Sequence, residues 1–313
     1  MLLGRTASGL YWMHRYIERA ENIARIIDAG LRMALTSSAG VMEEWKSVVI
    51  CSGTDAGFRE KYTDYTAAAV TDYLLRDVDN PSSVLACIEA ARSNGRMVRT
   101  ALTREVWETL NEIWMSLKVA LSERFAESEL PGTLDRIKRE MALIRGTFHG
   151  TMLRNEIFDF ASIGTFIERA DNTARILDVK YHVLLPSVSA VGSALDNLQW
   201  ESILRSVSAH RSYRWVYDGQ YKSRNVADYL ILNGRMPRSL QFCYRNIVQH
   251  LSYLSEDYGI DRSCHHVTAD TLAMLKDKTV DQIFELGLHE FLTDFIKQNN
   301  RLGNEITENY NFT

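Results

Sequence analysis

Apolar residues recur every three or four positions along most of the chain, which is the spacing of one face of a helix. Ile17, Ala20 and Ala24 belong to one such stripe, and polar residues occupy the positions between them. No segment alternates convincingly between apolar and polar residues as a half-buried strand would. The pattern predicts an all-α fold with long helices over 12–34 and 162–184. Segments rich in Gly, Ser, Pro, Asp and Asn predict breaks at 51–62, 127–133, 186–196, 232–237 and 256–266.

One helical segment occurs twice. Residues 16–28 return as residues 166–178, and nine of the thirteen positions are identical. Weaker matches follow in the same order, among them 81–83 with 237–239. The chain is therefore expected to contain an internal duplication.

The expected architecture is one domain over 1–313, built of two homologous halves of about 1–147 and 148–313. Neither half is expected to bury its apolar faces alone, so the halves should pack against each other. We predict a pseudo-two-fold duplicated helical bundle.

The repeat keeps its polar residues as well as its apolar ones. Residues three or four apart share a face of a helix, so each copy carries a polar strip, with Arg19 and Arg169 toward its edge. The strips consist of Glu18, Arg19, Glu21, Asn22, Arg25 and Asp28, and of Glu168, Arg169, Asp171, Asn172, Arg175 and Asp178. Helix packing requires only the apolar pattern, so the kept polar face is expected to be paired, buried or used.

Two interpretations of the strips stay open. In the structural one, the strips meet between the halves, where arginines pair with carboxylates and asparagines fill the remaining donors and acceptors. In the functional one, they line a polar cleft that holds a charged ligand or a peptide. Both hold if the cleft is only partly filled.

The functional interpretation gives four candidate catalytic residues. Arg25 or Arg175 would clamp a carboxylate, and Glu18 or Glu168 would act as a general acid or base if desolvated. An open pocket that exposes all four would favour an enzyme. A closed, fully paired strip would favour a binding or a purely structural role.

Composition narrows the classes of partner. The 313 residues are 46% hydrophobic and 24% charged, an ordinary globular balance, and the net charge of −4 advertises no nucleic-acid-binding surface. No apolar run approaches the roughly 20 residues of a membrane span, and no secretory signal is expected at the start. The four cysteines form no Cys-x-x-Cys pair, so we expect reduced thiols and a cytoplasmic location.

Motifs for cofactors and metals are missing from the sequence. There is no glycine-rich loop for a nucleotide phosphate. The third residue after each repeated glutamate is acidic, not the histidine of a di-iron bundle. Cys264, His265 and His266 are adjacent, and adjacent side chains on a helix point in different directions, which favours a surface or helix-capping role. We expect no metal and no cofactor.

The segment 205–224 is basic and aromatic. It is expected either to dock an acidic partner or phosphate group, or to form a half-buried hairpin whose arginines stack on aromatic rings. Arginine and aromatic side chains often dominate binding energy at interfaces. The candidate partner-binding residues are Arg211, Arg214, Trp215, Tyr217 and Tyr221.

Several segments together resemble the bacterial alpha-E domain family, and the likeness covers essentially the whole chain. It is carried by 3–12, 16–22, 80–83, 88–92 and 167–172. The resemblance implies an all-helical protein. It also implies that the gene lies near genes for ATP-grasp ligase-like proteins, transglutaminase-like peptidases and proteasome-like hydrolases. Some family members are fused to the ATP-grasp protein. The resemblance supplies no settled catalytic residue.

This gene neighbourhood implies a role in making, tagging or processing a peptide. We favour a helical accessory protein that binds an ATP-grasp-type ligase or its peptide substrate, because the ligase would supply the ATP chemistry whose motifs are missing. The alternatives are an enzyme that uses the Glu/Arg/Asn cleft on a peptide or carboxylate substrate, and a purely structural scaffold. A homo-oligomer also stays open.

Overall fold

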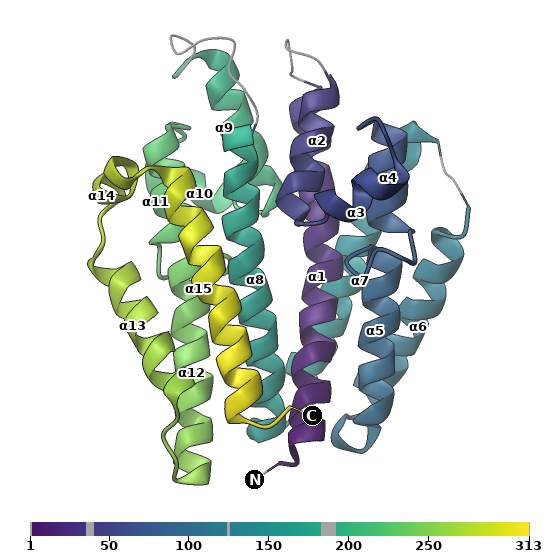
Figure 1. Ribbon diagram of the computed structural model, residues 1–313, viewed down its shortest axis with the longest axis vertical. Helices are drawn as coiled ribbons and strands as arrows, with labels where there is room; N and C mark the ends of the chain where they lie inside the picture. Colours follow the sequence, from purple (N-terminus) through teal and green to yellow (C-terminus); the bar gives the residue numbers. More distant parts are fainter. Residues whose placement is uncertain (1, 36–40, 124–125, 183–191, 313) are drawn as a thin grey trace.

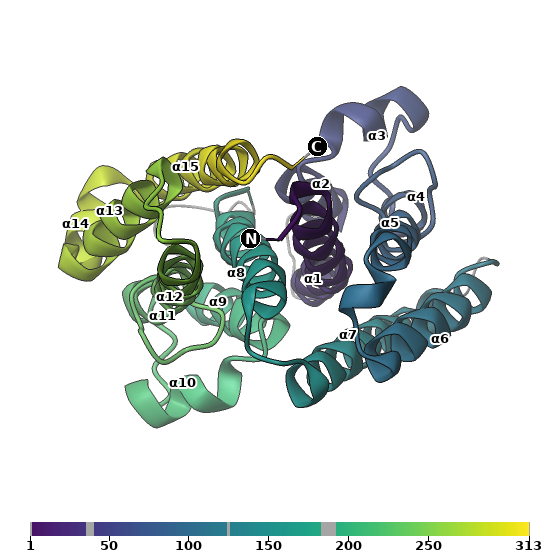
Figure 2. The ribbon, with the colours of Figure 1, turned by 90° about the horizontal axis from the view of Figure 1, so that it is seen from below.

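Two long helices, α1 (Gly4–Ala34) and α8 (Glu156–His182), lie side by side at the centre of the molecule (Figures 1 and 2). The Leu2 backbone N–H donates to Glu156 Oε2 over 2.9 Å, so both helices start at the same end and run parallel. The computed structural model describes residues 2–35, 41–123, 126–182 and 192–312. Every regular element in these ranges is a helix, which confirms the all-α prediction.

The central pair approaches closely because one contact lacks a side chain. A Cβ atom added at Gly164 would lie 2.3 Å from the Tyr11 carbonyl oxygen, which only glycine avoids. All residues from 20 to 30 of α1 are buried, polar ones included. A helix buried all round must satisfy its polar side chains internally.

The elements between α1 and α8 in the chain cover one side of the central pair (Figure 2). α5 and α7 pack directly against α1, and α6 lies outside them against both. The expected boundary between halves, at 147–148, falls within α7. The elements are α2 (Val41–Ser52), α3 (Asp55–Lys61), α4 (Ala67–Leu75), α5 (Val84–Met97), η1 (Arg99–Ala101), α6 (Arg104–Ala120), η2 (Glu127–Glu129) and α7 (Leu130–Thr151).

The remaining helices cover the other side. α12 and α15 pack against α8, and α13 lies against both of them. Across the described ranges, no helix is both long and apolar enough to cross a membrane. The helices are α9 (Ala194–Ser206), α10 (His210–Tyr217), α11 (Ser223–Ile231), α12 (Leu240–Tyr258), α13 (Ser263–Asp277), α14 (Val280–Leu286) and α15 (Leu288–Asn309).

Matching serine caps fix where α5 and α12 begin. Ser83 Oγ accepts from the Ala86 backbone N–H over 3.1 Å, and Ser239 Oγ accepts from the Phe242 N–H over 3.0 Å. Each such cap stabilises a helix by about 1 kcal/mol. Because α5 packs on α1 and α12 packs on α8, the residues just before the caps lie near the central helices.

The predicted breaks need correction at three places. The 232–237 break is confirmed between α11 and α12, but 51–62 contains α3. That short helix is held by Phe58, which is fully buried and stacks on Tyr62 and Tyr65. The Phe58 ring also meets that of Tyr73 on α4, 5.3 Å away between centroids, and this aromatic packing outweighs the loop-like composition.

The other two corrections concern helix ends. α7 begins inside the predicted 127–133 break, with a proline in its first turn where no N–H is needed. The 256–266 break narrows to 259–262, because α12 ends at a left-handed Gly259. Part of the 186–196 break lies outside the described residues, and α9 begins within its described end.

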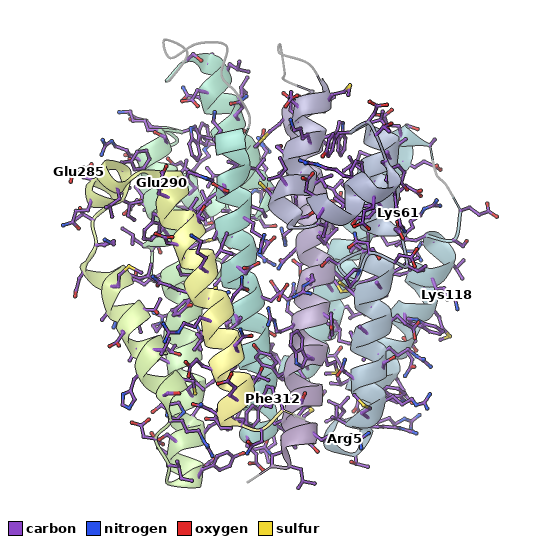
Figure 3. All side chains as sticks on the ribbon, in the orientation of Figure 1. Arg5, Lys61, Lys118, Glu285, Glu290 and Phe312 are labelled. Carbon is purple, nitrogen blue, oxygen red and sulfur yellow. The ribbon has the colours of Figure 1, made fainter. Side chains whose placement is uncertain are left out.

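The last described residues return to the first turn of α1. Phe312 lies near Arg5 at the lower end of the molecule in Figure 3, and its ring centroid is 5.3 Å from that of Tyr11. A Cβ atom added at Gly4 would lie 2.1 Å from the Asn311 carbonyl oxygen. These contacts hold residues 311 and 312 against the start of α1.

Candidate functional site

The two polar strips meet across the α1–α8 contact. Arg19 donates to Glu168 Oε1 over 2.6 Å and to Oε2 over 3.0 Å. Reciprocally, Arg169 donates to both carboxylate oxygens of Glu18, each over 2.9 Å. Bidentate arginine–carboxylate pairs are among the strongest hydrogen-bonded ion pairs, so the repeated Glu-Arg pairs tie the central helices together.

Around Glu18 and Glu21 the strip is closed, and we call this part the closed end. Arg238 donates to Glu18 Oε1 over 2.9 Å and to Glu21 Oε1 over 2.6 Å. Arg25 donates to the same Glu21 oxygen over 2.9 and 2.5 Å, and Arg145 contacts both carboxylates. Both glutamates are 0% exposed. With the arginine from α8 included, four arginines enclose two carboxylates.

Around Glu168 and Asp171 the strip is open, and we call this part the open end. Arg15 joins Arg19 at Glu168, over 2.8 Å, and Arg175 donates to Asp171 Oδ2 over 2.5 Å. Three arginines accompany two carboxylates here. A cavity of about 190 Å³ is lined by Arg15, Arg19, Asn22, Ile23, Ile26, Ser52, Gly53, Ser82, Glu168, Asp171, Asn172, Arg175 and Asn300.

A single pair of positions explains much of the difference between the two ends. Arg238 stands directly before the cap of α12, and its guanidinium bridges the two glutamates of the closed end. Ser82 stands directly before the cap of α5 and lines the cavity. The short serine side chain does not reach across the open end as the arginine does at the closed end.

Several buried polar atoms of the cavity-lining residues have no hydrogen-bond partner among the described residues. They are Asn22 Oδ1, Asp171 Oδ1 and both amide atoms of Asn172. Asn22 is 4% exposed and Asn172 is 2% exposed. Leaving a buried polar group unpaired costs about 1–3 kcal/mol, so such a cluster calls for a bound polar molecule or ordered water.

The arginines hold Glu18, Glu21 and Glu168 in the ionised form. Burial alone would raise the pKa of Glu168, but the attraction and hydrogen bonds of Arg19 and Arg15 lower it to about 2. At the closed end burial again opposes ionisation and the arginines prevail. The pKa of Glu21 falls to about 2, and the pKa of Glu18 falls well below its ordinary range. A general acid or base works best with a pKa near the working pH, so these groups suit binding better than proton transfer.

The nearby cysteines are also unsuited to catalysis. Cys87 lies in the electrostatic neighbourhood of Arg19, and Cys243 in that of Arg169. Burial raises the pKa of each thiol to about 12, and the arginines only partly oppose it. The thiolate is the nucleophilic form, so neither sulfur is activated at neutral pH.

The far ends of the strips contact outer helices. Asp28 pairs with Lys138 of α7 over 3.0 Å, and Asp178 pairs with His289 of α15 over 2.6 Å. The structure thus divides the four catalytic candidates. Glu18 and Arg25 are enclosed, whereas Glu168 and Arg175 line the cavity.

The five partner-binding candidates lie on α10 and on the connection that follows it, and none of them lines the cavity. Arg211 and Arg214 are exposed, and Trp215 is 81% exposed. Tyr217 is half-buried and donates to Asp228, and the half-buried Tyr221 bonds His210 over 2.7 Å. Three candidates therefore face solvent, and the two tyrosines fix the segment.

The cysteine–histidine cluster lies in the first turn of α13. Cys264 is buried, while His265 Nδ1 bonds Asp261 Oδ1 over 2.6 Å and its Nε2 bonds the Tyr310 hydroxyl over 3.0 Å. His265 therefore anchors the start of the helix. In the part of the chain that the structure describes, no three His, Cys, Asp or Glu residues are grouped to hold a metal.

Sequence reasoning missed residues that shape both ends of the strip. Arg238 and Ser82 occupy the middle positions of the matched segments 237–239 and 81–83, so the Arg-to-Ser difference was a readable signal. Arg145 of α7 carried no such signal, because the closing segments of the halves show no clear match. Arg15 lies one residue before the first copy and has Thr165 as its counterpart, so the repeat does not single it out.

The reciprocal pairs bear on the family of the protein. A family model named Alpha-E, described as a predicted alpha-helical domain with a conserved ER motif, matches residues 2–311. The chain belongs to the Alpha-E family. In this Alpha-E protein each repeated Glu-Arg pair supplies the carboxylate of one cross-helix ion pair and the guanidinium of the other. This arrangement gives a physical reason for adjacent glutamate and arginine in such a motif.

The Alpha-E chain is similar to longer mycobacterial proteins. It is 24% identical over 277 residues to uncharacterized proteins of Mycobacterium bovis and Mycobacterium tuberculosis, covering 82% of this chain and 30% of each relative. The chain thus spans less than a third of the length of these relatives. No solved structure shows a significant match.

Proposed function

We propose that this Alpha-E protein is a non-catalytic helical accessory protein that works with an ATP-grasp-type ligase in peptide synthesis, tagging or modification. Its part would be to bind the ligase or the ligase's peptide substrate. The observation that carries the proposal is the open end, a polar cavity beside charged groups whose buried hydrogen-bonding atoms are unmatched. Such a cavity suits recognition of one polar group of a larger molecule, since whole-ligand sites usually enclose about 300–1,000 Å³.

Binding fits the site better than catalysis. An enzyme using Glu168 as acid or base would need the pKa of that carboxyl near neutrality, whereas its arginine partners lower it to about 2. A purely structural scaffold would be expected to pair both ends alike. The closed end meets that expectation, and the open end does not.

The ligase enters the proposal through the family. Membership of the alpha-E family implies an association with ATP-grasp ligase-like proteins, to which some members are fused. The mycobacterial relatives extend well beyond the matched region, which leaves room for further domains. The four buried, free thiols agree with work in the reducing cytoplasm, where such ligases would find ATP.

We also infer that the bundle is internally duplicated about a pseudo-two-fold axis between α1 and α8. The reciprocal Glu-Arg pairs and the matching serine caps of α5 and α12 support this inference. Superposing the two halves tests it. If α1 and α8 take unlike positions within their halves, the inference fails.

The exposed residues of α10 are the proposed ligase-facing surface. Arg211, Arg214 and Trp215 project from one short helix, and their side-chain types are those that dominate many interfaces. No residue of this surface lines the cavity. One protein could therefore contact a ligase with α10 and a peptide group with the open end.

The test is reconstitution with an ATP-grasp-type protein from the same genome. Co-elution in gel filtration, and peptide-dependent ADP release that requires the Alpha-E chain, are the expected results. Asp171→Asn should reduce peptide dependence without preventing co-elution. ADP release by the Alpha-E chain alone, or full ligase activity without it, would contradict the accessory role.

A further inference from the structure

We propose that the cavity at the open end binds a guanidinium group, as carried by an arginine side chain of a peptide. The inference rests on the proposed function and names the chemical group that the accessory protein would recognise. Its starting point is the closed end, where the protein's own Arg238 shows what completes a paired strip. That guanidinium bridges the two glutamates over 2.9 and 2.6 Å.

The open end has no guanidinium in the place that corresponds to Arg238. The closed end combines two carboxylates with four arginines, and the open end combines two carboxylates with three. One further guanidinium beside Glu168 and Asp171 would reproduce the charge balance that the fold already accommodates. Ser82 leaves the corresponding place free of an arginine from the chain itself.

The unmatched atoms also favour a ligand that donates hydrogen bonds. Three are acceptors, Asn22 Oδ1, Asp171 Oδ1 and Asn172 Oδ1, and one is the donor Asn172 Nδ2. Glu168 already has arginine partners but can take another, since Glu18 Oε1 accepts from both Arg169 and Arg238. A guanidinium offers five donors in one plane and no acceptor.

A guanidinium is favoured over an ammonium for a physical reason. Burial, and then repulsion from Arg25, lower the pKa of Arg238 to about 10. The charged form of a fourth cation is therefore disfavoured at such a site. A guanidinium stays charged after such a shift. The compact charge of an ammonium cannot bridge two carboxylates in a fork, as the Arg238 guanidinium does at the closed end.

Calorimetry with three matched probes tests the inference. Acetyl-arginine amide should bind with a stoichiometry of one. Acetyl-citrulline amide, its neutral isostere, should bind at least about tenfold more weakly, since charge-assisted hydrogen bonds are lost. Acetyl-lysine amide should also bind more weakly. Free arginine and agmatine distinguish a peptide-borne group from a small metabolite, because the proposal expects neither to bind more tightly than the acetyl amide.

Three variants locate the binding. Ser82→Arg should abolish binding by placing the chain's own guanidinium in the cavity, and Asp171→Asn should weaken it by removing a carboxylate. Arg238→Ser should open the closed end and raise the stoichiometry to two. If Ser82→Arg does not fold, the arginine affinity of Asp171→Asn still shows whether the probe binds in this cavity. Unchanged arginine binding in the variants that fold, or equal binding of citrulline and arginine, would overturn the inference.

The two proposals fail in distinguishable ways. If acetate or phosphate binds at the cavity in place of the arginine probe, the guanidinium inference is wrong. Co-elution with the ligase would then still support the accessory role. Arginine binding without any ligase complex would retain the site and remove the ligase.

Discussion

The asymmetry of the two strip ends predicts that two equivalent arginines differ in their contribution to stability. Arg25 and Arg175 occupy the same position of the repeat. The Arg25 side chain is 8% exposed, and it also donates to the Ser206 carbonyl over 2.6 Å. The Arg175 side chain is 24% exposed and makes one carboxylate pair. We expect Arg25→Ala to destabilise the protein more than Arg175→Ala.

The magnitudes follow from burial. Removing one partner of a buried ion pair costs about 3–5 kcal/mol. Glu21 keeps Arg145 and Arg238, so the lower limit, about 3 kcal/mol, applies to Arg25→Ala. Arg175→Ala loses partly solvated hydrogen bonds and should cost about 1 kcal/mol. With an unfolding entropy of about 2.1 cal/mol/K per residue over 313 residues, Tm should fall by about 4–5 °C and 1.5 °C respectively.

Thermal melts of the two variants provide the assay. Arg205→Ala is the matched control, since Arg205 is 45% exposed and pairs with Glu201 one helical turn away. Its effect should stay within about 0.5 kcal/mol. Equal losses for Arg25→Ala and Arg175→Ala, or a larger loss for Arg175→Ala, would refute the division into a closed and an open end.

Three further predictions concern protons, ATP and the partner. The pKa values of Glu21 and Glu168 are lower in the folded protein, so the unfolded state binds protons first as pH falls. The free energy of unfolding should therefore drop between about pH 4.5 and 2, and it should drop less steeply in Glu168→Gln. Thermal melts of both proteins at acid pH check this. Calorimetry should detect no tight ATP binding by the chain alone, because no glycine-rich phosphate loop is present, and low-micromolar binding with magnesium would contradict the accessory role. Arg211→Glu combined with Arg214→Glu should abolish ligase binding in a pull-down while circular dichroism stays unchanged, since both side chains are exposed.

The sequence predicted the helical class and the grouping of the strip residues on one helix face because both depend on local spacing. Glu18 and Arg19 recur together in the second copy of the repeat, and helix geometry places most of the strip residues on one face. The short helix α3 was missed because Phe58 is buried partly against Tyr73, which lies on α4 and outside the segment whose composition predicted a break.

The difference between the two ends was harder to foresee. Arg145 lies 127 positions from Glu18 in the chain, and Arg238 lies 220 positions away. No local rule connects such residues before the fold is known. Only the Ser82 and Arg238 difference within a matched segment was visible, and its meaning depends on which helix each residue approaches.

A crystal structure grown with acetyl-arginine amide tests the central claim most directly. The claim is that one end of the repeated strip is structural and the other is a binding site. We predict the guanidinium of the probe between Glu168 and Asp171, with Arg238 still bridging Glu18 and Glu21. Ordered water alone in a cavity that satisfies Asn22, Asp171 and Asn172, or a probe bound elsewhere, would contradict the account.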